Sequence, residues 1–108
     1  MSMKQSIDWD NLGFNAHETK SMYIAKFDSN GNCLDKGLVP YGDIKLSPAA
    51  TVLNYGQGVF EGTKAYETSK KRVVFFRLNE NAKRFKNSCL RLCMPEIPNE
   101  MFVNAVKE

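Results

Sequence analysis

The chain has 108 residues, of which 43% are hydrophobic and 25% are charged, and its formal net charge is +3. This length allows one globular domain with a small core. No apolar run approaches the roughly 20 residues that span a membrane, and the N-terminus lacks the apolar centre of a secretory signal. Asp8 and Asp10 argue against a transit peptide, so we expect a cytoplasmic protein with no membrane partner.

The cysteines fit the same expectation. Cys33, Cys89 and Cys93 cannot all pair with one another, and His17 is the only histidine that could complete a metal site. Cys89 and Cys93 lie four residues apart among apolar neighbours. This pattern favours buried free thiols over a metal centre and indicates a reducing compartment.

Residues 1–20 are polar with scattered apolar positions. They predict an irregular N-terminal arm, which we expect to dock Trp9 and Phe14 onto the rest of the molecule. The remaining residues, 21–108, form the predicted domain.

Two extended runs open this domain. The first covers 22–28, and the second begins at Cys33 and is expected to end near Gly37. The turn between them contains Asn30 and Gly31. An Asn-Gly pair between two such runs is the strongest short-range signal for a β-hairpin, so a hairpin is predicted here.

The next segments predict a loop and a short helix. Residues 39–46 contain proline and glycine and are expected to form an extended connection. Ser47 and Pro48 then place a hydroxyl cap before a proline at the first helical position. They predict a helix over about 49–55, which Gly56 ends.

Aromatic and β-branched residues follow and predict two strands. These cover 59–66 and 72–77, and the polar residues 67–71 form the turn between them. We expect the two strands to pair in antiparallel fashion.

After the second strand, the apolar period changes to three and four residues. The recurring positions are Leu78, Ala82, Phe85, Cys89 and Leu92. This spacing predicts an amphipathic helix over 80–93. Asn79 is its expected N-cap, and Pro95 and Pro98 are expected to end it.

A last helix opens at Asn99 and reaches Glu108 without a glycine or another stop signal. We therefore expect the domain to be truncated at its C-terminus. The predicted fold is α+β: a small antiparallel sheet from 22–36, 59–66 and 72–77, with helices packed on one face.

The run 53–66 is the strongest candidate for a binding site. Its glycines and aromatic residues are Gly56, Gly58 and Gly62, and Tyr55, Phe60 and Tyr66. Glycine in an extended segment indicates that something approaches the backbone closely. With aromatic side chains as walls, this composition predicts a ligand pocket.

Two charged residues leave alternatives open. Arg84 lies at the flank of the apolar stripe, where its guanidinium can bind an anion; the periodicity alone favours a packed stem with the charge in water. Glu61 lies within the predicted strand. A structural ion pair of Glu61 with Lys64 or an arginine is favoured there over acid–base catalysis.

Two segments of the sequence resemble a known family. They are 47–66, SPAATVLNYGQGVFEGTKAY, and 74–95, VFFRLNENAKRFKNSCLRLCMP. Both are similar to the branched-chain amino acid aminotransferases, fold-type IV enzymes that depend on pyridoxal 5′-phosphate. The similarity runs from about Leu12 to the end of the chain, and the FEGTKAY and NxxRFxxS elements are its most specific parts. It covers only the smaller, N-terminal domain of the family.

The resemblance implies roles for five residues. Arg84, in NAKRFKNS, matches the arginine that binds the cofactor phosphate. Phe60 and Gly62, in VFEG, match positions that line the substrate pocket, with the Gly62 backbone near the substrate carboxylate. Tyr55, in LNYG, matches a tyrosine of the hydrophobic side-chain pocket that often reaches across a dimer interface. Phe14, in LGFN, matches a further aromatic wall.

The resemblance also implies what these residues lack. In the family, the lysine that forms the Schiff base with the cofactor belongs to the larger C-terminal domain. We therefore expect no catalytic residue in this fragment and no activity from it alone. The full-length homodimer would transfer the amino group of leucine, isoleucine or valine to 2-oxoglutarate.

Other functions are ranked lower. A D-amino acid aminotransferase or an aminodeoxychorismate lyase also has fold type IV, but FEGTKAY resembles these enzymes less well. A non-enzymatic module could bind nucleic acid through the basic residues of 83–91. No aromatic stacking pattern supports that alternative, so we expect no nucleic-acid partner.

Overall fold

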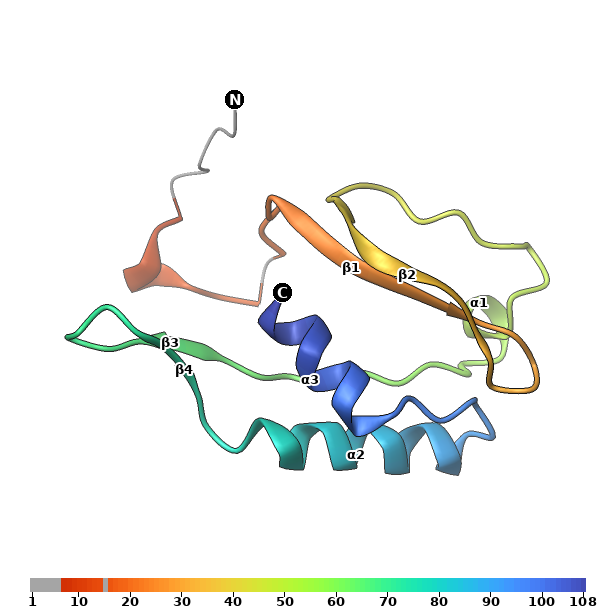
Figure 1. Cartoon of the computed structure of the whole chain (residues 1–108). Coiled ribbons are helices and arrows are strands. Elements are labelled where there is room, and N and C mark those ends of the chain that lie inside the picture. The colour runs from red at the N-terminus through yellow and green to blue at the C-terminus, as the bar shows by residue number, and fades with distance from the viewer. Residues whose placement is uncertain (1–6, 15) are drawn as a thin grey trace.

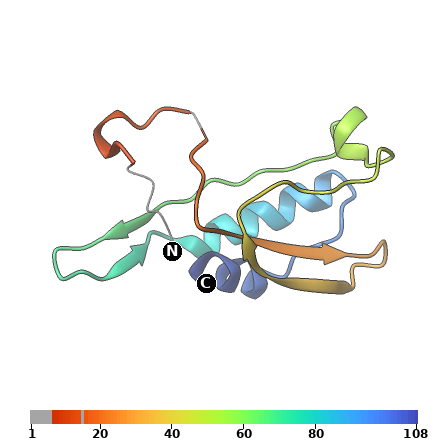
Figure 2. The same cartoon turned by 90° about the horizontal axis from the view of Figure 1, so that it is seen from above.

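The computed structural model describes residues 7–14 and 16–108 and confirms the α+β class (Figure 1). The elements are a 3₁₀ turn η1 (Trp9–Asn11), β1 (Ser21–Phe27), β2 (Cys33–Pro40), α1 (Thr51–Asn54), β3 (Ala65–Glu67), β4 (Val73–Phe75), α2 (Leu78–Arg91) and α3 (Asn99–Lys107). The strands form two separate antiparallel pairs, β1 with β2 and β3 with β4, rather than the single sheet expected from the sequence. Figures 1 and 2 place the two pairs toward opposite ends of α2.

The first hairpin is confirmed, and its second strand is longer than expected. β2 pairs with β1 as far as Pro40, opposite Ser21, rather than ending near Gly37. The turn is closed by Asp28, whose carboxylate accepts hydrogen bonds from the backbone N–H of Asn30 and of Asn32, both at 2.9 Å. Asn30 and Gly31 therefore lie in the turn between the two strands, as the sequence predicted.

The strand predicted over 59–66 is wrong for most of its length, because only Ala65–Glu67 pairs with β4. Residues 57–64 are extended but lie along α2 (Figures 1 and 2). Side chains hold this segment at both ends: Gln57 Nε2 donates to the carbonyl of Leu92 at 2.8 Å, and an α2 side chain binds the Gly62 carbonyl. Contacts with the helix thus replace the backbone ladder of a strand.

The short helix begins later than predicted. The Ser47 hydroxyl accepts the N–H of Ala49 at 3.1 Å, but this closes a turn that precedes the helix, which starts at Thr51. Gly56, with φ +64°, follows the helix as expected. Gly58 permits a close approach, since a Cβ there would lie 2.9 Å from Cγ2 of Val52.

The core is built on the apolar face of α2 and follows the predicted stripe except at Leu92, which is 37% exposed. Leu78, Ala82 and Cys89 are buried, with exposed fractions of 7%, 1% and 1%. Phe85 packs against Phe102 of α3, with 5.3 Å between the ring centroids. Burial of this apolar face is the main favourable term that joins α2 to α3.

Both ends of α2 differ from the prediction. The N-cap is Arg77, in the left-handed conformation with φ 53°, and not Asn79, which lies inside the helix. The helix ends at Arg91, before either proline, because Cys93 turns the chain with φ 57°. Cys93 is consequently exposed, as is Cys33, so the expectation of buried thiols holds only for Cys89.

The predicted docking of the arm is wrong. Trp9 is 74% exposed and Phe14 is fully exposed. Asp8 closes η1 on itself by accepting the N–H of Asp10 and the side-chain amide of Asn11. The turn is therefore satisfied by its own polar groups and stands apart from the helices (Figure 1).

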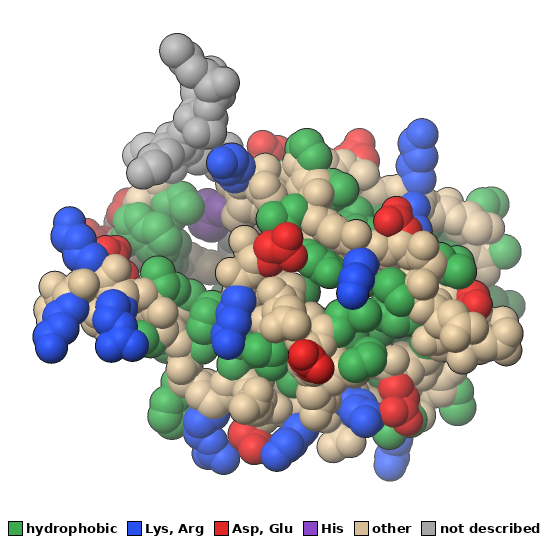
Figure 3. Space-filling model, in the orientation of Figure 1, with side chains coloured by type: hydrophobic (Ala, Val, Ile, Leu, Met, Phe, Trp, Pro, Cys, Tyr) green, Lys and Arg blue, Asp and Glu red, His purple; other side chains and the backbone are tan. Residues whose placement is uncertain are grey.

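Many large hydrophobic side chains lie at the surface. Figure 3 shows apolar side chains spread among charged ones over one face of the molecule. Among the described residues, no helix has the length and apolar character that crossing a membrane requires.

Candidate functional site

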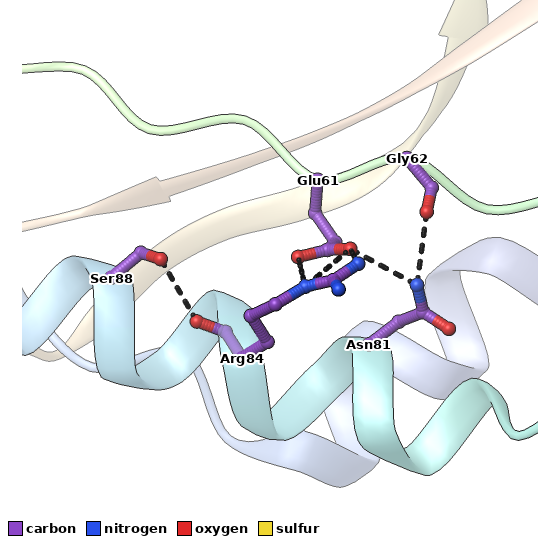
Figure 4. Close-up of polar contacts among 5 residues, drawn as sticks. All are labelled: Glu61, Gly62, Asn81, Arg84 and Ser88. Carbon is purple, nitrogen blue, oxygen red and sulfur yellow. Dashed lines mark hydrogen bonds and ion pairs between the residues drawn. The ribbon is translucent and has the colours of Figure 1, made fainter.

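Arg84 and Glu61 form the central contact of the candidate site (Figure 4). Arg84 lies on α2, and Glu61 lies on the extended segment that runs along this helix. The Arg84 Nε–H donates to Glu61 Oε2 at 2.8 Å, and Nη2 donates to Oε1. The sequence-based expectation that Glu61 forms a structural ion pair with an arginine is confirmed.

The two partners differ sharply in exposure. The side chain of Glu61 is 4% exposed, whereas that of Arg84 is 68% exposed. A carboxylate that loses its water is costly unless hydrogen bonds replace the water. The buried partner is therefore the one that depends on the pair, and the guanidinium still faces solvent.

Asn81 completes the cluster. Its side-chain amide donates to Glu61 Oε1 at 3.0 Å and to the carbonyl of Gly62 at 2.9 Å (Figure 4). Hydrogen bonds from Arg84, and secondarily from Asn81, lower the pKa of Glu61 to about 2 despite the opposing effect of burial. The hydrogen bond from Arg84 to Glu61 in turn raises the pKa of Arg84.

Sequence reasoning assigned no role to Asn81. The signal was present, because residues three apart on a helix lie on the same face, and Asn81 is the first residue of the NxxRFxxS element that contains Arg84. The last residue of that element, Ser88, donates its hydroxyl to the Arg84 carbonyl at 3.0 Å. The element therefore places its polar side chains along one side of α2 (Figure 4).

Arg84 lies between two surface hollows. The first has a volume of about 670 Å³ and is lined by Gly62, Thr63, Lys64, Tyr66, Phe76, Arg77, Glu80, Asn81 and Arg84. The second has a volume of about 560 Å³ and is lined by Gly58, Val59, Phe60, Arg84, Asn87, Ser88, Arg91 and Leu92. Cationic side chains outnumber acidic ones in both linings, which favours an anionic ligand.

The structure gathers some of the predicted site residues and separates others. Arg84 and Gly62 line the first hollow, and Arg84 and Phe60 line the second. Phe60 is 92% exposed and Tyr55 is 84% exposed. Tyr55 and the fully exposed Phe14 line neither of these two hollows.

Among residues 7–14 and 16–108, no group of three His, Cys, Asp or Glu side chains is arranged to hold a metal ion. The exposed guanidinium of Arg84 can bind an anion beside the Gly62 backbone and the Phe60 ring.

Comparison with known proteins gives a consistent result. The chain is 46% identical over 102 residues to branched-chain-amino-acid aminotransferase 2, chloroplastic, of Arabidopsis thaliana. It is 45% identical over 103 residues to branched-chain amino acid aminotransferase 1, mitochondrial, of Humulus lupulus. It is 42% identical over 104 residues to the branched-chain-amino-acid aminotransferase of Helicobacter pylori.

These alignments cover 94–96% of this chain. They cover 26–30% of the relatives, so the chain spans only about a quarter of the length of the curated proteins it matches. No protein-family model matches the chain. Over nearly its whole length, the chain is therefore a homologue of part of the branched-chain amino acid aminotransferases, as its sequence motifs predicted.

Proposed function

We propose that this chain forms part of a branched-chain amino acid aminotransferase, which moves the amino group of leucine, isoleucine or valine to 2-oxoglutarate. One structural observation carries the proposal in addition to the homology. Arg84 is fixed on one edge by Glu61 and remains open to solvent on the other, beside the Gly62 backbone. This arrangement is what recognition of a phosphate or carboxylate requires.

The residues fit pyridoxal 5′-phosphate, the cofactor that the family resemblance implies. Arginine has N–H donors on Nε, Nη1 and Nη2, and within the described part of the chain Nη1 makes no hydrogen bond. Lys64 and Arg77 line the same hollow and add positive charge near that group. We assign the cofactor phosphate to Arg84. When bound, the cofactor withdraws electrons from the amino acid that reacts with it.

The substrate assignments follow the same pattern. We propose that the Gly62 backbone binds near the substrate carboxylate, because its neighbourhood is open and a Cβ there would meet no atom within 4 Å. We assign Phe60, Tyr55 and Phe14 to the apolar walls around the branched side chain. All three are exposed and so are available to such a pocket.

The proposal extends to assembly and location. A homodimer in which Tyr55 reaches toward the partner subunit agrees with the exposure of this side chain, 84%. We propose a cytoplasmic enzyme, like the expectation from sequence. The plant relatives cited above are named chloroplastic and mitochondrial, and the Helicobacter pylori relative carries no such term.

Measuring glutamate formation from leucine and 2-oxoglutarate tests the function. The protein at its natural full length is expected to turn over leucine, isoleucine and valine. The 108-residue chain alone is expected to be inactive, because the family resemblance assigns the covalent cofactor lysine to another part of the enzyme. A full-length protein that transaminated D-alanine but not leucine would contradict the proposal.

A further inference from the structure

We propose that Glu61 is a positioning residue for Arg84: its carboxylate fixes one edge of the guanidinium so that the other edge is preoriented for the cofactor phosphate. This inference rests on the proposed function, since it needs Arg84 to bind that phosphate. It adds a role for a residue that touches neither the phosphate nor the reacting atoms.

The exposure of the two side chains indicates that Glu61 orients Arg84 and not the reverse. Glu61 is nearly buried and Arg84 is mostly exposed, so the carboxylate is the fixed element and the guanidinium is the mobile one. A free arginine side chain populates many rotamers and loses that freedom when it binds a ligand. Contact with a buried partner removes much of this freedom before the ligand arrives.

The carboxylate is itself held in place. The Asn81 amide binds Glu61 Oε1 at 3.0 Å and bridges to the Gly62 carbonyl at 2.9 Å. Asn81 and Arg84 lie on the same face of α2, so both residues hold the Glu61 carboxylate against one rigid helix. The position of the Glu61 carboxylate relative to the helix is therefore fixed, and the ion pair fixes the orientation of the Arg84 guanidinium in turn (Figure 4).

The geometry of the pair leaves a suitable edge for an anion. Glu61 engages the Nε and Nη2 side of the guanidinium. The remaining donors belong to Nη1 and to the second Nη2–H, which together can bind two phosphate oxygens. A side-on pair therefore orients the arginine without consuming the donors that the phosphate needs.

An opposite effect is physically possible and makes the inference testable. Glu61 carries a negative charge close to the place proposed for a phosphate dianion, and this repulsion weakens binding. If repulsion were larger than the gain from orientation, Glu61→Gln would bind the cofactor more tightly than the unaltered protein. The inference requires weaker binding.

The experiment measures the affinity of the full-length protein for pyridoxal 5′-phosphate and for pyridoxal, which lacks the phosphate, by absorbance titration. Arg84→Gln is expected to weaken binding of the phosphorylated form about 100-fold, and Glu61→Gln about tenfold. Neither change should affect pyridoxal. Glu96→Gln is the matched control, because Glu96 pairs with Lys86 and lines neither of the two hollows beside Arg84. This variant should bind both forms normally.

A double-mutant cycle gives the second readout. If Glu61 acts through Arg84, Glu61→Gln should have no further effect on affinity in the Arg84→Gln background. Equal losses for pyridoxal and its phosphate, or additive losses in the cycle, would show a merely structural role and overturn the inference.

Different results would contradict the binding of phosphate by Arg84 and the positioning role of Glu61. Normal affinity of Arg84→Gln for the phosphorylated cofactor overturns the phosphate assignment and the inference with it. Weak affinity of Arg84→Gln together with normal or tighter affinity of Glu61→Gln overturns the inference alone. Should Glu61→Gln not fold, Glu61→Asp keeps the charge but shortens the reach, and the same loss for the phosphorylated form alone is expected.

Discussion

The polar cluster on α2 and the exposed aromatic residues are built in opposite ways. Glu61, Asn81 and Arg84 are joined by hydrogen bonds within this chain. Phe60 and Tyr55 come from the same run of sequence as Glu61, yet they are 92% and 84% exposed. One half of the candidate site is held by its own contacts, and the other half is presented to the surroundings.

The difference reflects what each half needs. An anion site depends on the angle and distance of a few donors, and these are fixed most precisely by hydrogen bonds to a rigid element. An apolar wall depends on enclosure, which a single exposed ring does not provide. We therefore expect the polar cluster to stabilise the fold and the aromatic residues to contribute little to it.

Within the polar cluster, the largest expected loss of stability comes from Asn81→Leu. This change keeps the size of the side chain but removes both of its hydrogen bonds, leaving Glu61 and the Gly62 carbonyl with one donor fewer each. Loss of a donor to a buried carboxylate costs about 2 kcal/mol of unfolding free energy. Urea denaturation followed by circular dichroism measures this loss.

Asn87→Leu is the matched control for this prediction. Asn87 lies on the same helix, is exposed, and makes no side-chain hydrogen bond to the described residues. Its replacement should change the unfolding free energy by less than about 0.5 kcal/mol. Equal losses for the two variants would mean that the cluster does not stabilise the fold.

The second-largest effect is expected at acid pH, where protonation of Glu61 should lower the stability of the fold. The pKa of Glu61 is lowered from 4.5 to about 2 in the folded state. Its contribution to stability is therefore complete above the unfolded pKa and is lost as the pH falls from about 5 toward 2. The melting temperature of the unaltered chain should exceed that of Glu61→Gln by about 5 °C at pH 6, and this difference should shrink toward pH 2.

The control for the acid effect is Glu80→Gln. Glu80 forms a pair with Lys83 in which both side chains are more than half exposed, and such pairs contribute little. The difference in melting temperature between this variant and the unaltered chain should stay near zero at every pH. A difference for Glu61→Gln that is constant with pH would contradict the assigned pKa.

The same contrast explains what the sequence could predict. The first hairpin and the stripe of α2 follow from neighbouring residues, because the Asn30-Gly31 turn and the three- and four-residue spacing are local signals. Residues 59–64 of the extended segment were predicted to belong to a strand because their composition favours one. The conformation of this segment is set instead by contacts with residues distant in sequence, such as Gln57 with the Leu92 carbonyl, which no local pattern contains.

In the candidate site, too, local sequence signals identified some residues and missed their contacts with distant segments. Arg84 was assigned through the family motif, since its position on the helix alone favoured a solvated charge. The partner of Glu61 was foreseen only as an unspecified lysine or arginine, and Asn81 was missed as a contact. Asn81 and Arg84 lie three residues apart on α2 and therefore share one face. The segment that crosses this face could be identified only in three dimensions.

The smallest effect on stability is expected from the aromatic residues. Tyr55→Ala and Phe60→Ala should each change the unfolding free energy by less than about 0.5 kcal/mol, because both rings are already exposed. Phe85→Ala is the control, since Phe85 packs on Phe102 at 5.3 Å, and it should cost about 2 kcal/mol or more.

The same two variants should separate stability from function. In the full-length enzyme, Tyr55→Ala and Phe60→Ala are expected to raise KM for leucine about tenfold, the size of effect that a lost apolar contact produces. A normal KM for leucine in both variants would show that neither ring lines the substrate pocket. A loss of stability as large as that of Phe85→Ala would instead show that the rings serve the fold, and the contrast between the two halves of the site would no longer hold.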